Sequence, residues 1–337
     1  MNDSVNMLKS VFDHPYRSDV CFICATPLND TNQTEEHVFP KWLQERFNLW
    51  NQHLILLNDT DIKYKQLTIP CCFKCNNTQL SPLEKRISEA TEIGFDALKK
   101  IPRFDIFKWM AKIFLGMQYK ELSLSINRRK PEYGNIITPE IIQHYTILHF
   151  WLQMNYSKND PKFSPGSLWI FQCQEPKLIE HRFDLKDDAT NGVLAIRLGK
   201  VAIVADFLEN GVHQEINSEK TKKVSQFPLH PMQFDELTAI TIYEAGLLGQ
   251  KTEISFFENE DGSTTYAVEW WSTVKGNSAM RPWNPSDYAK VLSFYTGLPY
   301  EFVYQPPGKL RTWLHDPDQN LVYWEIGKPH PFAEKNT

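Results

Sequence analysis

The chain has 337 residues, and its 36 Lys and Arg against 41 Asp and Glu give a net charge of −5. This length leaves room for two domains, and an apolar content of 42% is ordinary for a globular protein. No apolar run reaches the roughly 18 residues that a membrane helix needs, and the N-terminus lacks the pattern of a secretory signal. We therefore expect a cytoplasmic protein without a membrane span.

Short elements are predicted in the first hundred residues, followed by longer helices. A helix is expected to open near Asn76, and Ser81-Pro82-Leu83-Glu84 resembles a fresh helix start with a serine cap and proline in the first turn. Apolar spacing then stays helical as far as Lys100. The other expected elements are a knuckle and strand at 18–28, a helix at 40–48, strands at 55–57 and 66–69 around an Asn58-Asp59 turn, and helices at 104–122 and 139–156.

The pattern changes after a turn-rich segment at 159–166. Strand-like runs follow, Gly199 is expected to form a turn or bulge, and Asp261-Gly262 is a good hairpin turn. These features predict an α+β domain with an antiparallel sheet. Its expected elements are strands at 167–172, 181–185 and 193–207, a helix at 233–248, and a hairpin at 252–258 and 264–272.

Two C-x-x-C pairs are the strongest motif in the chain. Cys21 and Cys24 form the first pair, and Cys72 and Cys75 form the second. Four thiolates at this spacing can close a tetrahedral structural zinc site. Cys71 is adjacent to the second pair, but only Cys72 gives the two-residue spacing. The remaining cysteine, Cys173, lies in an apolar run and is expected to be an inert buried thiol.

A segment with candidate catalytic residues lies between the two cysteine pairs. It reads Glu36-His37-Val38-Phe39-Pro40, and Asn76 directly follows the last cysteine of the second pair. With these residues the region at about 18–90 resembles the zinc-stabilised nucleases of the HNH family. The resemblance implies a small ββα-metal finger in which the histidine ends the first strand.

The resemblance assigns a role to each of these residues. His37 would be the general base, and Glu36 and Asn76 would hold a catalytic divalent cation. One departure is that the last position of the family pattern is Asn76 rather than a histidine, a variant that the family tolerates. For the family's middle asparagine, which supports the loop carrying the base, Asn58 is the best candidate and Asn51 the other. A further departure is that 47 residues separate Cys24 from Cys72, which indicates an insertion in the hairpin.

These residue types suit phosphodiester hydrolysis. An imidazole titrates near neutrality and can take the proton of an attacking water. Oxygen ligands and bound water suit Mg²⁺ or Mn²⁺, which would stabilise charge on the phosphate. The expected function is therefore a metal-dependent endonuclease, acting on DNA by preference, with a structural zinc. An RNA substrate and a non-catalytic zinc module that binds nucleic acid or protein remain open alternatives.

The net negative charge is unusual for an enzyme that binds nucleic acid, because binding depends on phosphate neutralisation. The stretch from Lys99 to Lys130 is nevertheless basic, with only Asp105 and Glu121 as acids. It could supply a basic face toward nucleic acid or simply form a solvated helix surface.

The sequence thus predicts three parts: a nuclease finger at 1–100, a helical connector at 101–160, and an α+β domain at 161–337. The last part shows no catalytic spacing of acids. Four of its tryptophans, Trp270, Trp271, Trp283 and Trp313, could stack on bases but are expected in the core. In bacterial anti-phage and restriction systems HNH fingers are coupled to sensor domains, so the resemblance is compatible with a defence role and with a partner or activator acting through this part.

Overall fold

The computed structural model describes residues 14–138, 141–142, 145–153, 166–248, 254–258, 264–268, 280–306 and 308–331. The chain divides into two compact units, an α+β arrangement with antiparallel sheets. Unit 1 comprises Met1–Glu92, Lys100–Lys162 and Glu253–Glu269, and unit 2 comprises Ile93–Lys99, Phe163–Thr252 and Trp270–Thr337. The segment predicted as a separate connector thus clusters with the cysteine-rich segment, because its long helix supplies much of that unit's core.

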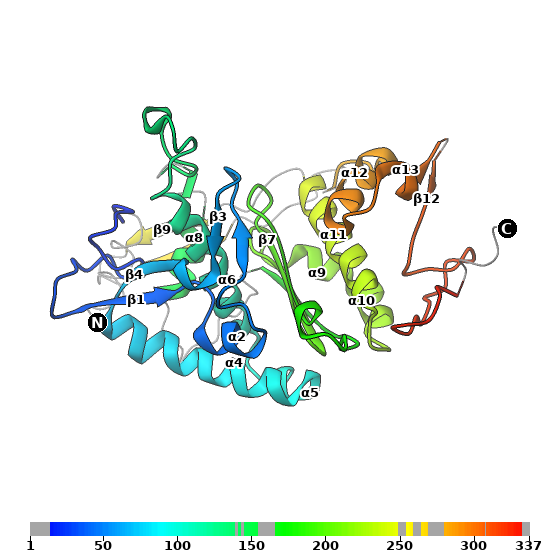
Figure 1. The fold of residues 1–337 in the computed structure, drawn as a ribbon, viewed down its shortest axis with the longest axis horizontal. Coiled ribbons are helices and arrows are strands. Elements are labelled where there is room, and N and C mark those ends of the chain that lie inside the picture. The colour runs from blue at the N-terminus through cyan, green and yellow to red at the C-terminus, as the bar shows by residue number, and fades with distance from the viewer. Residues whose placement is uncertain are drawn as a thin grey trace. The chain divides into compact units, whose positions relative to one another are not determined.

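Unit 1 is organised around a pair of antiparallel strands, β1 (Gln33–His37) and β4 (Thr68–Cys72). Figure 1 shows the two arrows side by side, although about 30 residues separate them in the chain. His37 lies opposite Thr68, and Glu36 lies opposite Ile69. This pairing brings the second cysteine pair to the start of β1.

A separate hairpin occupies the connection between these strands. It consists of β2 (His53–Ile55) and β3 (Asp61–Lys63), and its turn includes Asp59 with φ of +58°. The predicted turn at Asn58-Asp59 is therefore present, but the strand expected at 66–69 pairs with β1 rather than across this turn. The polar strand β3 carries too little apolar alternation to be found by pattern.

A nearly unbroken helical run follows β4. It comprises α3 (Phe73–Cys75), a π-helical turn (Asn76–Leu80) and α4 (Ser81–Ile93). The predicted fresh start at Ser81 is wrong, because Ser81 has helical φ and ψ of −58° and −45°. A proline lacks the N–H of a helical hydrogen bond and crowds the carbonyl four residues earlier. The wide π turn immediately before Pro82 accommodates it within the helix.

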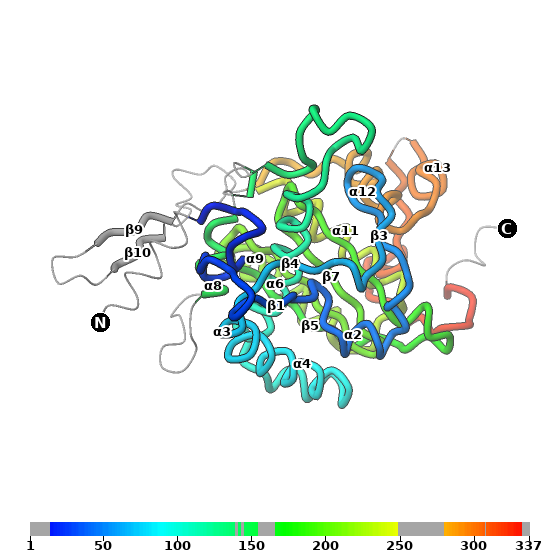
Figure 2. Tube along the Cα trace, turned by 60° about the vertical axis from the view of Figure 1, so that its left-hand side comes forward, coloured from blue at the N-terminus to red at the C-terminus, as the bar shows by residue number. Residues whose placement is uncertain are grey.

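The long helix α6 (Arg103–Glu121) lies in the core of unit 1. It lies against β4 in both views (Figures 1 and 2) and is buried on almost every side. Gly116 faces β1 and β4, because a Cβ there would lie 3.2 Å from Val38 and 3.3 Å from Ile69. The predicted helix at 104–122 is thus present within one residue at each end.

Smaller helices complete unit 1. In α2, the Arg46 guanidinium donates to Thr91 at 2.9 Å and to Ser88 in α4. The predicted helix at 139–156 is α8 in part, and His149 within it is buried, while His144 lies outside the described residues. The remaining bounds are α2 (Lys41–Arg46), short 3₁₀ turns at Tyr64–Gln66 and Pro131–Tyr133, α8 (Thr146–Gln153), and the antiparallel strands β9 (Ile254–Glu258) and β10 (Thr264–Val268).

Unit 2 is built on a four-stranded antiparallel sheet in the order β5-β8-β7-β6. Gly199 has φ of +62° and forms the turn between β7 and β8. Of the turn and the bulge that the sequence allowed at this glycine, the structure has the turn. The two central strands are buried along their whole length. The strands are β5 (Ser167–Gln172), β6 (Phe183–Asp188), β7 (Val193–Leu198) and β8 (Val201–Asp206).

Helix α11 packs on the central strands of this sheet and also contacts α12 (Figure 1). It begins after His230, whose ring nitrogen accepts from the N–H of Met232 at 3.1 Å. Trp313 is in the core as expected, whereas Trp283 is 42% exposed and packs on Tyr243. The helices and small strands of unit 2 are α5 (Phe95–Leu98), α9 (Val212–Ile216), α10 (Ser218–Val224), α11 (Pro231–Leu247), α12 (Pro285–Thr296), α13 (Tyr300–Val303), a 3₁₀ turn (Ile179–His181), β11 (Tyr304–Gln305) and β12 (Lys309–Leu310).

Within the residues that the structure describes, no helix combines the length and apolar character needed to cross a membrane. Trp270, Trp271 and the Asp261-Gly262 turn fall outside those residues. The flanking strands β9 and β10 do pair antiparallel, as the predicted hairpin requires.

Candidate metal centre and the His37 region

The four cysteines of the two C-x-x-C pairs come together in unit 1. The Sγ atoms of Cys21, Cys24, Cys72 and Cys75 all lie within 4.8 Å of one another. Sulfurs bound at about 2.3 Å to one tetrahedral zinc are about 3.8 Å apart, and Cys24 and Cys72 have that separation, 3.8 Å. The group could therefore hold a metal ion such as zinc.

Local backbone structure prepares both cysteine pairs for this arrangement. At the first pair, the N–H of Ala25 donates to the carbonyl of Cys21 at 2.9 Å, and Ala25 adopts a φ of +55°. At the second, the N–H of Cys75 points at the sulfur of Cys72 at 3.4 Å. An N–H directed at a sulfur favours its thiolate form, which is the form that binds metal.

Two cysteines remain outside the cluster. Cys71 is buried with its Sγ 4.0 Å from that of Cys21, so it packs against the centre rather than replacing Cys72. Cys173 is buried in unit 2, and burial raises the pKa of its thiol to about 12. A thiol with so high a pKa is unreactive at neutral pH, as the sequence predicted.

His37 ends strand β1 and is half-buried. Its ring lies 5.7 Å from that of Trp50, centroid to centroid. Burial, with help from the positive charges of Lys41 and Lys112, lowers the pKa of His37 below its ordinary 6.5. The imidazole is therefore neutral at pH 7 and able to accept a proton. Its Nδ1 atom is buried and makes no hydrogen bond with any residue that the structure describes.

Glu36, the neighbour of His37, is buried and forms an ion pair with a lysine from α6. Its Oε1 atom lies 2.5 Å from Nζ of Lys112, whose side chain is fully buried. The same ammonium contacts Glu84 of α4 at 2.9 Å. Burial raises the pKa of the Glu84 carboxyl to about 7, although Lys112 opposes that effect. A catalytic cation at Glu36 would therefore share the carboxylate with Lys112.

The two faces of β1 separate the predicted site residues. Side chains alternate along a strand, so Thr34 and Glu36 share one face while Glu35 and His37 share the other. Asn76 belongs to the first face, because its amide donates to the hydroxyl of Thr34 at 3.1 Å. The structure thus brings Glu36 and Asn76 to the same side of the strand, with His37 at its end.

The candidates for a middle asparagine have other partners. Asn58 accepts from the N–H of Thr60 at 3.0 Å and donates to the carbonyl of Ser125 at 2.7 Å. Asn51 accepts from Lys65 at 2.9 Å. Asn58 therefore braces the turn of the β2–β3 hairpin, and the aromatic ring of Trp50 lies against the imidazole instead.

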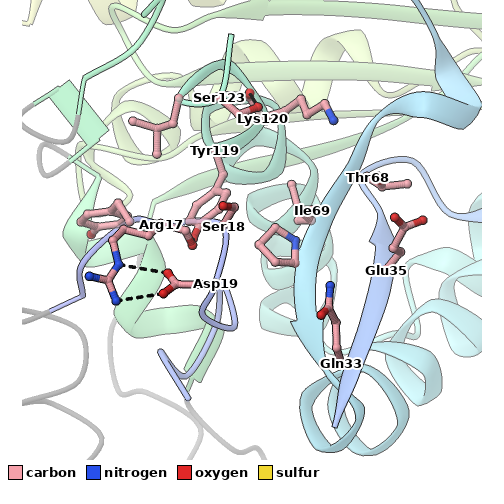
Figure 3. A pocket seen from close by; sticks show the side chains of 13 residues that line it. Arg17, Ser18, Asp19, Gln33, Glu35, Thr68, Ile69, Tyr119, Lys120 and Ser123 are labelled. Carbon is pink, nitrogen blue, oxygen red and sulfur yellow. Dashed lines mark hydrogen bonds and ion pairs between the residues drawn. The ribbon is translucent and has the colours of Figure 1, made fainter. Parts of the chain in front are cut away.

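A cavity of about 530 Å³ lies along β1 and β4 (Figure 3). Gln33 and Glu35 of β1 stand at one side of it, near Thr68, which is the cross-strand partner of His37. The ion pair between Arg17 and Asp19 stands at the other side, with N–O distances of 3.0 and 3.1 Å. The end of α6 contributes Tyr119 and Lys120, and Ser123 follows just after the helix. The lining is polar and carries both signs of charge.

The basic stretch from Lys99 to Lys130 contains both exposed and buried residues. Lys112 is fully buried at the Glu36 cluster, and Lys108 is only 7% exposed. Burial lowers the pKa of Lys108 to about 8. Arg128, Arg129 and Lys130 do remain exposed beyond α6. Lysines inside α6 are buried because this helix is packed on almost every side. A count of charges along the sequence cannot detect that packing.

Sequence reasoning missed the role of three residues: Lys112, Glu84 and Trp50. A signal for Lys112 does exist, because it is the single charge in the apolar run Trp109-Met110-Ala111-Lys112-Ile113-Phe114. A buried lysine almost always has an acidic partner. The identity of that partner, two segments away in the chain, has no local signal.

The geometry stands without help from known relatives. Comparisons of the chain with models of protein families, with curated proteins and with solved structures found no match.

Proposed function

We propose that unit 1 is a metal-dependent nuclease of the HNH type, with DNA as its first candidate substrate. The observation that carries the proposal is a strand–strand–helix frame, β1, β4 and α3–α4, that has His37 at the end of β1 and the four-cysteine centre near the start of the same strand. In a ββα-metal finger the same order of elements holds the general base and the ligands of a divalent ion. The zinc would be structural, since four thiolates leave no open position for substrate.

His37 would act as the general base. A proton acceptor for water must be neutral at the working pH, and burial keeps this imidazole neutral. The contact with Trp50 restricts the orientation of the ring. His37 would take the proton of a water aligned with the scissile phosphate.

Glu36 and Asn76 would hold the catalytic Mg²⁺ or Mn²⁺. They lie on one side of β1, and their carboxylate and amide oxygens are the donors that these ions prefer. Glu36 and Glu84 together carry one more negative charge than Lys112 neutralises when both are ionised, and that excess would attract a divalent ion. The ion would supply positive charge to the phosphate oxygens.

The helix geometry at Asn76 supports a functional site there. Asn76 is the first residue of the π-helical turn, a rare conformation that is frequent at functional sites. The turn widens the helix where the amide faces Thr34 of β1. A regular α-helix would rotate Asn76 relative to the residues that follow.

The cavity beside Glu35 and Thr68 is large enough for a nucleotide of the substrate. Tyr119, Ser18 and Ser123 provide polar groups, and Lys120 provides a positive charge. Phosphate binding there would be weak and salt-dependent, because Glu35 and Asp19 line the same cavity. Weak binding of the free chain fits the net charge of −5.

The proposal is tested by plasmid cleavage with wild type and His37→Ala, in Mg²⁺ or Mn²⁺ and in EDTA, with zinc content measured for both. We expect cation-dependent nicking or linearisation by wild type, and a loss of at least about 100-fold in His37→Ala, the usual worth of a general base. Zinc content and the melting temperature should stay close to wild type.

A suitable control is His53→Ala, since His53 is an exposed histidine of unit 1 paired with Asp61. It should cleave like wild type. Absence of cleavage by zinc-loaded wild type on plasmid, single-stranded DNA and RNA, with and without cell extract, would contradict the proposal and favour a zinc module that only binds. The burial of Glu36 against Lys112 is the observation that favours such a module.

A further inference from the structure

The Lys112 ammonium is enclosed by oxygen atoms. It lies 2.5 Å from the Glu36 carboxylate and 2.9 Å from that of Glu84. It also lies 2.5 Å from the carbonyl oxygen of His37 and 3.1 Å from that of Val38. Its side chain has no exposed surface. An ammonium has three N–H donors, so four oxygen neighbours at these distances saturate it.

Three of these four oxygens belong to consecutive residues. One side chain from α6 therefore contacts the carboxylate of Glu36 and the backbone carbonyl oxygens of the next two residues, His37 and Val38. That segment ends β1 and leads to Pro40 at the start of α2. The contacts fix the position of the backbone that carries the imidazole.

The ammonium also orients Glu36. Its Nζ atom lies 2.5 Å from Oε1 of Glu36, and this contact fixes the position of the carboxylate that would hold the cation. Partners behind a metal ligand commonly set its orientation and charge, and their removal weakens metal binding or activity. Glu84 offsets the charge of Lys112, so the cluster does not repel a divalent ion.

We propose that Lys112 is a positioning residue for the nuclease reaction, which holds the base His37 through its carbonyl and the ligand Glu36 through its carboxylate. The inference rests on the proposed function. It assigns to α6, a helix outside the predicted finger motif, a direct part in aligning the catalytic residues. Lys112 itself does not touch the substrate or the reacting atoms.

The first test compares Lys112→Met with Lys108→Met. Lys108 is a buried lysine one turn earlier in α6, so its substitution controls for removal of a buried charge from the same helix. Lys112→Met should lower kcat by about 10- to 100-fold, the range for groups that orient metal ligands, with KM within about twofold of wild type. The Mn²⁺ concentration for half-maximal activity should rise. Lys108→Met should leave kcat and the Mn²⁺ requirement unchanged.

Lys112→Arg keeps the positive charge but changes the geometry of the donors. It therefore tests whether the alignment of His37 and Glu36 depends on the ammonium contacts rather than on the charge alone. A planar guanidinium directs its donors along a fork and cannot reproduce the contacts of an ammonium. We expect this variant to fold, to keep its zinc and still to lose at least about tenfold in kcat. A zinc-loaded Lys112→Arg or Lys112→Met protein that cleaves with wild-type kcat and Mn²⁺ requirement would overturn the inference.

A readout without activity keeps this test separate from that of the nuclease. The ring carbon–proton resonance of His37, assigned with His37→Ala, reports the surroundings of the imidazole. It should shift or broaden in Lys112→Met and Lys112→Arg and stay in place in Lys108→Met. If wild type does not cleave but the resonance responds in this way, the proposed function fails while Lys112 still positions His37. An unchanged resonance in both Lys112 variants would contradict the positioning role.

Discussion

At the scale of single residues, burial decides what each candidate side chain can do. His37 and Glu36 are neighbours in the sequence, yet one is a half-buried imidazole with a lowered pKa and the other is an anion locked to Lys112. Desolvation lowers the pKa of a histidine because it disfavours the charged form. Glu36 is instead held in an ion pair with a fully buried ammonium. The proposed function therefore gives proton transfer to His37 and cation binding to Glu36.

The cysteines allow a prediction at the same scale. Cys75→Ser removes a ligand of the proposed zinc site, and because structural zinc contributes on the order of 10 kcal/mol to small domains, unit 1 should unfold in large part. Zinc content should fall with it, as measured by metal analysis of the purified protein.

Cys173→Ser is the matched control, since this thiol is buried in unit 2 and belongs to no metal cluster among the described residues. It should keep the wild-type zinc content and cost about 1–3 kcal/mol for a hydroxyl buried without a new partner. Equal zinc content in Cys75→Ser and wild type would contradict the assignment of the ligands.

At the scale of secondary structure, the contact of α6 with β1 and β4 is what assembles the site. Gly116 lies one turn after Lys112 and allows this close approach. The same helix therefore holds the strands and supplies the ammonium that contacts His37. The π turn begins at Asn76, whose amide contacts Thr34 on the same face of β1 as Glu36.

Gly116→Leu should disturb the site without changing any of its chemical groups. A Cβ at this position would already lie 3.2 Å from Val38, so a larger side chain must move α6 away from the strands. Such overpacking costs about 1–3 kcal/mol. We expect a lower melting temperature and a loss of cleavage larger than that of an exposed substitution in another helix of unit 1, such as Lys85→Ala in α4. Wild-type cleavage by Gly116→Leu would show that the spacing of helix and strands does not matter.

At the scale of the whole molecule, the two units carry buried histidines of opposite character. In unit 1, burial lowers the pKa of His149 to about 3. Its contribution to the free energy of unfolding is therefore present above pH 6.5 and is lost as the pH falls, because the unfolded chain then binds a proton that the buried ring does not. In unit 2, burial opposes but does not prevent a raised pKa of about 9 for His213, because Asp206 and Glu244 accept from its ring at 3.1 and 2.8 Å. The units should therefore respond differently to pH.

The prediction concerns His213. Its raised pKa gives a stabilisation that is complete below pH 6.5 and is lost as the pH rises through about 9. The shift corresponds to on the order of 3 kcal/mol. Urea unfolding of wild type and His213→Gln should therefore show a difference in the free energy of unfolding that is larger at pH 6 than at pH 9.5. A difference independent of pH would show that His213 is not charged in the folded protein.

Much of the fold follows from local patterns. The apolar spacing of α6 and α11 and the turn at Gly199 are visible in the sequence, and so is the pairing of cysteines into one cluster. The failures share one cause. The start expected at Ser81 is overridden by the packing of a longer helix, and the strand at 66–69 finds its partner about 30 residues earlier rather than across the nearest turn. Local propensity is weaker than the burial gained by such contacts.

The amino-acid sequence is enough to identify the groups available for chemistry: four thiols at metal spacing, and an acid, an imidazole and an amide close to them in the chain. Spacing of two residues within each C-x-x-C pair, and the adjacency of Glu36 to His37 and of Cys75 to Asn76, are local features that folding cannot separate. How these groups are used depends on contacts that form only in the folded chain. The tertiary structure places Glu36 and His37 on opposite faces of β1 and fills the space beside Glu36 with Lys112 from α6. These contacts join segments about 75 residues apart, and a buried charge selects its partner by position in the folded core.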